Sequence, residues 1–255
     1  MIEMPLKGLR IVVTRPRAQV FSLAQGIEAA GGIPLIFPLL EITATEINQD
    51  FSERLHALPS ANFVIFISPN AVRFGLEALR RAGVMFSPST QIAAVGQGTA
   101  RALREAGYRA LLVPEMQFDS EGLLALPGLQ QIEGQRIVIV RGEGGRELLA
   151  EVLRSRGAWV DYLECYARHP AVFDGWSLLA ERPDVLTVTS SEALDALWNG
   201  LDDAARAAIL DVPLLVIHPR IAARAQQQGW RNVQITAAGD DGLLEGLIAW
   251  AAREN

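Results

Sequence analysis

A segment near the start of the chain occurs a second time about half-way along it. Residues 8–15 read Gly-Leu-Arg-Ile-Val-Val-Thr-Arg, and 126 residues later residues 134–141 read Gly-Gln-Arg-Ile-Val-Ile-Val-Arg. The same offset carries Gly31 onto Gly157. Each copy has the pattern of a buried strand, a polar turn, an amphipathic helix and a second strand. One α/β plan is therefore present twice, and we expect two similar lobes with a ligand cleft between them.

Composition limits the classes of protein that this plan can serve. Of the 255 residues, 50% are apolar and 20% are charged, which is enough for two ordinary domain cores. The net charge of −6 argues against a nucleic-acid partner or an anionic membrane surface, because both need a basic face. No stretch approaches the roughly 18 apolar residues of a membrane span, and no signal peptide is recognised. We expect a cytoplasmic protein.

Cysteine and histidine are too few and too scattered for a metal centre. Cys165 is the single cysteine, which excludes an internal disulfide, and we expect it to be a buried apolar side chain. His56, His169 and His218 do not have the spacing of zinc ligands. We therefore expect no metal and no cofactor.

Small and hydrogen-bonding residues follow six of the predicted strands. In parallel sheets, ligands bind beyond the carboxyl ends of the strands, where helix N-termini present free N–H groups. Such ends suit a multiply anionic ligand in a protein without a net positive charge. Helix capping alone would also explain any one of them. The six are Thr14-Arg15, Ser68 to Asn70, Gly96 to Gly98, Arg141-Gly142, Thr189 to Ser191, and His218 to Arg220.

One of these turns offers an alternative function. Gly96-Gln97-Gly98 follows a strand and opens a helix, as a dinucleotide-binding turn does. The third glycine of that fingerprint is replaced by Arg101, and the equivalent turn in the other half has lost its glycines. The alternative is therefore a dinucleotide-dependent protein using this turn, or a two-lobed small-molecule-binding protein. A periplasmic binding protein should carry a signal peptide.

Tyr166 is the candidate for chemistry. It follows the strand predicted over residues 159–163, so it could stand at the mouth of the cleft. A phenol stays protonated at neutral pH and can act as a general acid. The alternative is an aromatic residue that packs at the hinge.

A set of motifs in order along the chain resembles the uroporphyrinogen-III synthase family. They cover nearly the whole chain, and no single motif is specific. They are residues 11–16 (Ile-Val-Val-Thr-Arg-Pro), 31–32 with 38–41 (Gly-Gly and Pro-Leu-Leu-Glu), 66–72 (Phe-Ile-Ser-Pro-Asn-Ala-Val), 94–100 (Ala-Val-Gly-Gln-Gly-Thr-Ala), 139–142 (Ile-Val-Arg-Gly), 165–168 (Cys-Tyr-Ala-Arg) and 189–193 (Thr-Ser-Ser-Glu-Ala).

The resemblance implies a domain division that the repeat alone would not suggest, since a plain duplication would be cut near residue 130. In this family the chain begins one domain, builds the whole second domain and returns. The implied domain 1 is residues 1–38 plus 169–255, domain 2 is residues 43–163, and residues 39–42 and 164–168 form a two-strand connector. Each domain would be a flavodoxin-like parallel sheet between helices.

The resemblance also implies the reaction. The substrate would be hydroxymethylbilane, an anionic linear tetrapyrrole. Loss of its hydroxyl gives an azafulvene, which closes through a spiro intermediate to uroporphyrinogen III with ring D inverted. The family uses no cofactor or metal. A monomer is the default expectation, and a transient contact with the preceding enzyme of the pathway is a further one.

Carried onto this sequence, the resemblance gives Tyr166 the role of hydrogen-bonding the departing hydroxyl. Two departures from the family pattern put hydroxyl contacts in doubt, at Ile67 and at Ile221. His218 is either a carboxylate partner there or a helix-start residue. The expected substrate-binding residues are Thr14, Arg15, Ser68, Asn70, Gly96, Gln97, Thr99, Arg141, Thr189, Ser190, Ser191, His218 and Arg220.

Overall fold

The computed structural model describes residues 4–109, 111–145 and 147–254; the outermost residues of the expected domain 1, 1–3 and 255, lie outside this range. The chain divides into two compact units. Unit 1 comprises Met1–Glu41 with His169–Asn255, and unit 2 is the single stretch Ile42–Arg168. The two copies of the repeat therefore belong to different units.

Unit 1 is built on a five-stranded sheet in the order β11-β10-β9-β1-β2, in which every pairing is parallel. The three central strands are almost wholly buried, while both edge strands are partly exposed. Continuous apolar runs suit strands covered on both faces. The strands are β1 (Arg10–Val13), β2 (Ile33–Ile36), β9 (Val185–Val188), β10 (Leu214–Val216) and β11 (Val233–Ile235).

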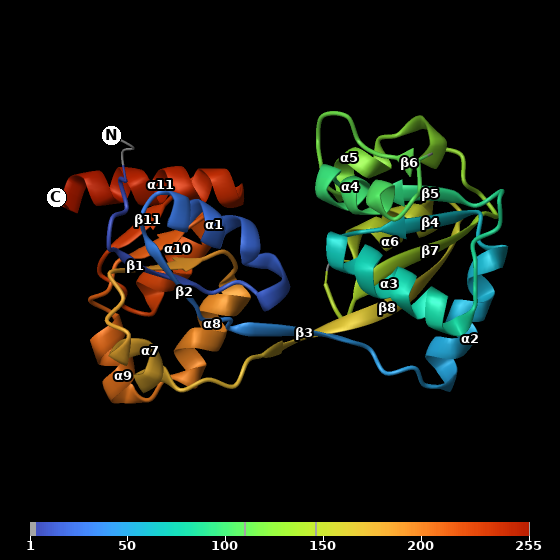
Figure 1. Ribbon diagram of the computed structural model, residues 1–255. Helices are drawn as coiled ribbons and strands as arrows, with labels where there is room; N and C mark the ends of the chain where they lie inside the picture. Colours follow the sequence, from blue (N-terminus) through green and yellow to red (C-terminus); the bar gives the residue numbers. More distant parts are fainter. Residues whose placement is uncertain (1–3, 110, 146, 255) are drawn as a thin grey trace. The chain divides into compact units, whose positions relative to one another are not determined.

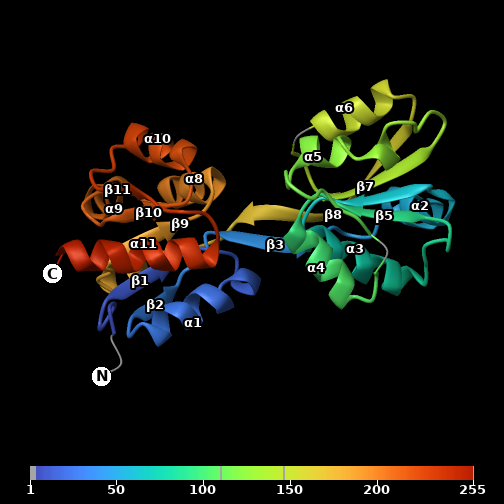
Figure 2. The same cartoon turned by 90° about the horizontal axis from the view of Figure 1, so that it is seen from above.

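Helices cover both faces of the sheet of unit 1, as Figure 2 shows. Alternate residues of β1 enter different cores: Val12 packs with α7, α8, α9 and α10, whereas Ile11 and Val13 pack with α1 and α11. The unit is thus a three-layer α/β domain. The helices are α1 (Phe21–Ala29), α7 (Gly175–Ala180), α8 (Ser191–Gly200), α9 (Asp203–Ile209), α10 (Pro219–Gln227) and α11 (Gly239–Glu254).

Unit 2 has a six-stranded sheet in the order β3-β8-β7-β4-β5-β6. The pairings from β8 to β6 are parallel. Its strands are β3 (Leu40–Ala44), β4 (Phe63–Phe66), β5 (Gln91–Ala94), β6 (Leu111–Leu112), β7 (Arg136–Gly142) and β8 (Trp159–Pro170). Its helices are α2 (Gln49–Ala57), α3 (Pro69–Ala82), α4 (Gln97–Glu105), α5 (Ser120–Leu124) and α6 (Leu148–Ser155). α2, α3 and α4 pack on one face, α5 and α6 on the other (Figures 1 and 2).

Two strands carry the chain from one unit to the other. β3 leaves unit 1 and β8 returns to it, and the two lie side by side (Figure 1). The Thr45 N–H donates to the Cys165 carbonyl at 3.1 Å, and the Ala171 N–H donates to the Leu39 carbonyl at 2.9 Å. Because residue numbers rise along β3 as those of their partners in β8 fall, this pair is antiparallel.

The two copies of the repeat have the same backbone design. Gly31 and Gly157 both lie in the left-handed region, at φ +87° and φ +83°. Their carbonyls accept from the Gly8 and Gly134 N–H groups at 3.0 and 2.9 Å. Glycine is favoured where a helix ends in this conformation. These glycines therefore close α1 and α6 and direct the chain into the next strand.

Candidate functional site

Three strand ends meet at one edge of the sheet of unit 2. β7, β4 and β5 are parallel neighbours, so Gly142 at the end of β7 lies beside Ser68 and Gly96, which follow β4 and β5. α3 begins directly after β4, where Ser68 Oγ accepts the Ala71 N–H at 3.0 Å. α4 begins at Gly96, which has no side chain to cap it. Pro69 has no N–H and Ser68 takes that of Ala71, so the free N–H groups at this edge are those of Asn70 and of the first turn of α4, which favours an anionic ligand.

Tyr166 lies against the same edge with its ring in the core. The residue is 1% exposed, and its ring stacks on Phe74 with centroids 5.6 Å apart. The hydroxyl is at the polar margin: Oη lies 3.1 Å from Ser68 Oγ, and Arg168 Nη2 donates to it at 3.4 Å. Ser68 is half-buried and Arg168 exposed. The ring therefore packs as a core residue while the hydroxyl joins a polar group.

A β-bulge sets the direction of the Tyr166 side chain. Arg141 pairs with Glu164, but Gly142 pairs with Tyr166, so Cys165 is an extra residue on β8. A Cβ on Gly142 would lie 2.5 Å from the ring of Tyr166. Bulges of this kind re-aim a side chain. Glycine at position 142 leaves the space that the ring fills.

Arg141, an expected substrate contact, is 2% exposed. Its Nε donates to the Gly142 carbonyl at 3.2 Å, its Nη1 pairs with Glu147 at 3.1 Å, and its guanidinium lies over the Tyr162 ring. A hydrogen bond from the Tyr162 hydroxyl, with a smaller effect of Arg141, lowers the pKa of Glu147. The side chain of Arg141 therefore fastens the loop after β7 and is not presented to solvent.

In unit 1 the end of β1 is also engaged within the fold. Thr14 is 1% exposed and donates its hydroxyl to the Thr187 carbonyl at 2.7 Å, while Thr187 donates to the Val12 carbonyl at 2.8 Å. Arg15 pairs with Asp240 at the start of α11. These side chains tie β1 to β9 and to α11.

Two further strand ends of unit 1 lead into helices. Ser190 Oγ accepts the Ala193 N–H at 3.0 Å and caps α8, as Ser68 caps α3 in unit 2. Thr189 and Ser191 are half-buried beside it. His218 is exposed, and its Nδ1 accepts the N–H of exposed Arg220 at 3.1 Å. His218 therefore acts here as the cap of α10.

The turn Gly96-Gln97-Gly98 lacks the backbone features of a dinucleotide fingerprint. Gly96 is extended, at φ −150° and ψ 171°, and a Cβ on Gly98 would make an ordinary 3.7 Å contact with Pro69. Neither position requires glycine, whereas the fingerprint uses glycine for a tight turn and close approach. Gln97 is exposed, Asn70 half-buried, and Thr99 4% exposed and directed into the core.

Cys165 is buried, and burial raises the pKa of its thiol to about 12. Over residues 4–109, 111–145 and 147–254, no group of three or more His, Cys, Asp or Glu side chains could hold a metal ion. None of the helices described has both the length and the apolar character needed to cross a bilayer.

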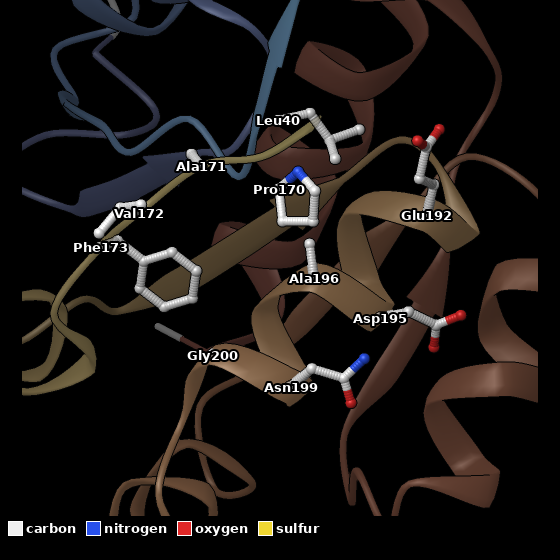
Figure 3. Close-up of a pocket in the computed structure, with 10 residues that line it drawn as sticks. All are labelled: Leu40, Pro170, Ala171, Val172, Phe173, Glu192, Asp195, Ala196, Asn199 and Gly200. Carbon is white, nitrogen blue, oxygen red and sulfur yellow. The ribbon is translucent and has the colours of Figure 1, made fainter. Parts of the chain in front are cut away.

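A pocket of about 760 Å³ lies in unit 1, and its lining includes Glu192, the residue after Ser191. Figure 3 shows Pro170 and Phe173 on one side of the pocket and Ala196 of α8 on the other, with the carboxylates of Glu192 and Asp195 pointing away from them. Asp195 is paired with Arg224 at 2.7 Å. None of the predicted site residues lines this pocket, and the sequence analysis did not anticipate it. Its lining is Leu40, Pro170, Ala171, Val172, Phe173, Glu192, Asp195, Ala196, Asn199 and Gly200.

Sequence reasoning also missed two residues around Tyr166. Arg168 follows it by two positions, and alternate residues of a strand share a face, so its place beside the phenol was predictable. Gly142 was noted only as part of a strand end. Its contact with the ring depends on the bulge, which leaves no signal in the apolar pattern.

Comparison with known proteins decides the family. The family model described as "Uroporphyrinogen-III synthase HemD" matches residues 22–245. The chain belongs to the uroporphyrinogen-III synthase family. It is 35% identical to the uroporphyrinogen-III synthase of Salmonella typhimurium and 33% identical to that of Escherichia coli, in each case over 94% of this chain and 100% of the relative.

Solved structures of the uroporphyrinogen-III synthase family share the fold. A mutant enzyme of Thermus thermophilus aligns with a TM-score of 0.63 at 21% identity, covering 97% of this chain and 100% of that one. The Helicobacter pylori enzyme aligns with a TM-score of 0.62 at 18% identity, covering 96% and 99%. The predicted family and the predicted two-domain α/β fold with parallel sheets are confirmed. The chain is an enzyme, a cyclising lyase of haem biosynthesis.

Proposed function

We propose that the enzyme closes hydroxymethylbilane to uroporphyrinogen III by holding the substrate through main-chain N–H groups and by using Tyr166 as a general acid. The observation that carries the proposal is the Tyr166 hydroxyl, which lies with Ser68 at an edge formed by three parallel strand ends. The family supplies the reaction, in which the terminal hydroxyl leaves and ring D is inverted.

Helix N-termini are the proposed contacts for the carboxylates of the substrate. The net charge of −6 means that the protein as a whole does not attract a polyanion, so binding requires local donors. α3 and α4 in unit 2 and α8 and α10 in unit 1 each begin at a carboxyl strand end. A helix N-terminus carries a partial positive charge and has N–H groups without a partner inside the helix. At α10, Pro219 has no N–H and His218 accepts those of Arg220 and Ile221, so this helix contributes through its partial charge. Such donors hold an anion without a basic surface.

The expected binding residues contribute in two ways in this proposal. Thr14, Thr99 and Arg141 are buried, so we assign their side chains to holding the strand ends in place. The more accessible members contact substrate through side chain or backbone. These are Arg15, Ser68, Asn70, Gly96, Gln97, Thr189, Ser190, Ser191, His218 and Arg220.

We attribute the choice of the type III isomer to the way in which the enzyme positions the substrate. Closure without inversion competes, so the enzyme must favour the spiro route by holding the reacting carbons close together. Tyr166 gives a proton to the hydroxyl, which leaves as water as its C–O bond breaks. The pyrrole supplies the electrons that form the azafulvene, and the N–H proton that the pyrrole loses restores the phenol. Because this chemistry requires no electrophilic metal, we expect turnover to survive treatment with a chelator.

The test is to supply freshly generated hydroxymethylbilane and to separate the type I and type III isomers chromatographically. The wild-type protein should yield predominantly the type III isomer. Product with the isomer ratio of the uncatalysed reaction would contradict the proposal.

Tyr166→Phe tests the general acid. A general acid typically contributes 10²–10⁴ in rate, and this leaving group departs readily, so we expect turnover to fall by about 10²-fold with some activity left. The variant keeps the ring that packs on Phe74, so a thermal melt should show a folded protein. Undiminished turnover in the folded variant would remove Tyr166 from the mechanism.

A further inference from the structure

Ser68 is held firmly at the start of α3. Its Oγ accepts the Ala71 N–H at 3.0 Å and its carbonyl accepts the Val72 N–H at 3.1 Å. Its backbone is extended, at φ −157° and ψ 161°, as is usual for an N-cap residue. Pro69 follows as the first helical residue. The position of the Ser68 hydroxyl is therefore set by a helix of 14 residues.

The Tyr166 ring is equally constrained, so only its hydroxyl hydrogen can turn. Phe74 stacks on one side, and Gly142 leaves no room for displacement toward β7. The bulge at Cys165 sets the direction of the side chain. The phenol oxygen is thus presented to two groups, Ser68 Oγ at 3.1 Å and Arg168 Nη2 at 3.4 Å.

The directions of these hydrogen bonds follow from the chemistry of the groups. A guanidinium has donors only, so Tyr166 Oη accepts from Arg168. A serine that caps a helix uses a lone pair for the helix N–H and keeps its hydrogen to donate. If Ser68 donates that hydrogen to Tyr166 Oη, the phenol keeps its own hydrogen for a third partner.

We propose that Ser68 is a positioning residue for Tyr166, donating its hydroxyl hydrogen to Tyr166 Oη so that the phenol hydrogen is directed to the departing hydroxyl of the substrate. No bond is made or broken at Ser68. As the phenol gives up its hydrogen, the charge that develops on Oη is stabilised by the Ser68 O–H and by the positive end of α3. This inference rests on the proposed function and deepens it, since it assigns the side chain of Ser68 to Tyr166 and leaves only the Ser68 backbone for substrate.

A double-mutant cycle of Ser68→Ala and Tyr166→Phe tests the assignment. Ser68→Ala should lower kcat about tenfold, the effect of one hydrogen bond of about 1.4 kcal/mol, with KM unchanged. In the Tyr166→Phe background the same substitution should change kcat less than twofold, because the group through which it acts is gone. Ser68→Thr keeps the hydroxyl and should restore most of the activity.

Loss of the helix cap needs a separate control, because Ser68→Ala also removes the bond to Ala71. Asn48 caps α2 in the same unit, with its Oδ1 accepting the Phe51 N–H at 2.8 Å. Asn48→Ala should destabilise the protein to a similar degree, in a thermal melt, with kcat unchanged.

Four outcomes decide the inference. If the wild type is active and Ser68→Ala lowers kcat equally in the Tyr166 and the Tyr166→Phe backgrounds, the inference is wrong. It is also wrong if Ser68→Ala raises KM without lowering kcat, because that result is typical of a residue that binds substrate. A wild type that makes no type III product overturns the proposed function and this inference together. If Ser68→Ala lowers kcat only in the protein that retains Tyr166, the assignment of Ser68 to Tyr166 is supported.

Discussion

At the scale of single residues, the site requires glycine at position 142, because there is no room for a side chain there. A Cβ there would lie 2.5, 2.6 and 3.0 Å from three ring carbons of Tyr166, closer than carbon atoms can pack. The ring is stacked on Phe74 and cannot retreat freely. A substitution at Gly142 must therefore move the phenol, the strand or both.

We therefore expect Gly142→Ala to lower kcat by more than its loss of folding stability would explain. Overpacking of this kind typically costs about 1–3 kcal/mol, and displacement of Oη from Ser68 should cut kcat at least tenfold. Gly128→Ala is the matched control, because a Cβ there would meet only Leu112 at 3.7 Å. Turnover and thermal melts of both variants check this. Normal kcat in the Gly142→Ala variant would show that the phenol tolerates displacement.

At the scale of elements, the bulge in β8 separates two neighbouring residues. Cys165 is the extra residue, with its Sγ directed to the Arg141 carbonyl at 3.4 Å, while Tyr166 pairs with Gly142. Burial raises the pKa of the thiol to about 12. At pH 8 the reactive thiolate is therefore scarce, and the surrounding core excludes reagents.

Because Cys165 is the single cysteine and lies in the bulge, the rate at which a thiol reagent labels the protein reports on whether the bulge is closed. We expect the native protein to resist an aromatic disulfide reagent at pH 8 and to react at once in denaturant. Since only the thiolate reacts, any slow labelling should accelerate as pH rises toward the pKa of the folded state. Stoichiometric labelling of the native protein within seconds would mean that β8 opens at this point.

The bulge also marks a limit of prediction from sequence. The strand, turn and helix order of each repeat was predictable, because Gly31 and Gly157 close helices in the way that their spacing implied. A bulge adds one residue to a strand and changes which face the following side chains occupy. The apolar pattern of residues 159–170 does not reveal that shift, so the sequence left open whether Tyr166 lines the cleft or packs at the hinge, and its ring is buried.

Strand ends were ambiguous for a related reason. Thr14, Thr99 and Arg141 looked like ligand contacts because polar residues at these positions often are. In the structure Thr14 bonds the neighbouring strand, Thr99 faces the core and Arg141 pairs with Glu147. Ser68 and Ser190 fit both a structural and a ligand-binding role, since each caps a helix and each belongs to the proposed site. Residue type alone does not separate a fold contact from a ligand contact.

At the scale of the whole molecule, the repeat gives each unit its own set of helix N-termini. Ser68 and Ser190 cap α3 and α8 with the same 3.0 Å bond, one in each unit. A short anion could be held by one set. A substrate carrying acetates and propionates along four pyrroles has carboxylates enough for both sets, and we propose that both are used.

Hydrogen exchange with bound uroporphyrinogen III tests that arrangement. Amides at the start of a helix exchange rapidly because they have no partner within the helix. If both sets of donors hold the ligand, exchange should slow at Asn70 and residues 97–99 of unit 2 and also at Ser191 of unit 1. The C-terminal turns of the same helices are the internal control. Protection confined to one unit would show that a single lobe binds the ligand, and the role proposed for the other set would then be wrong.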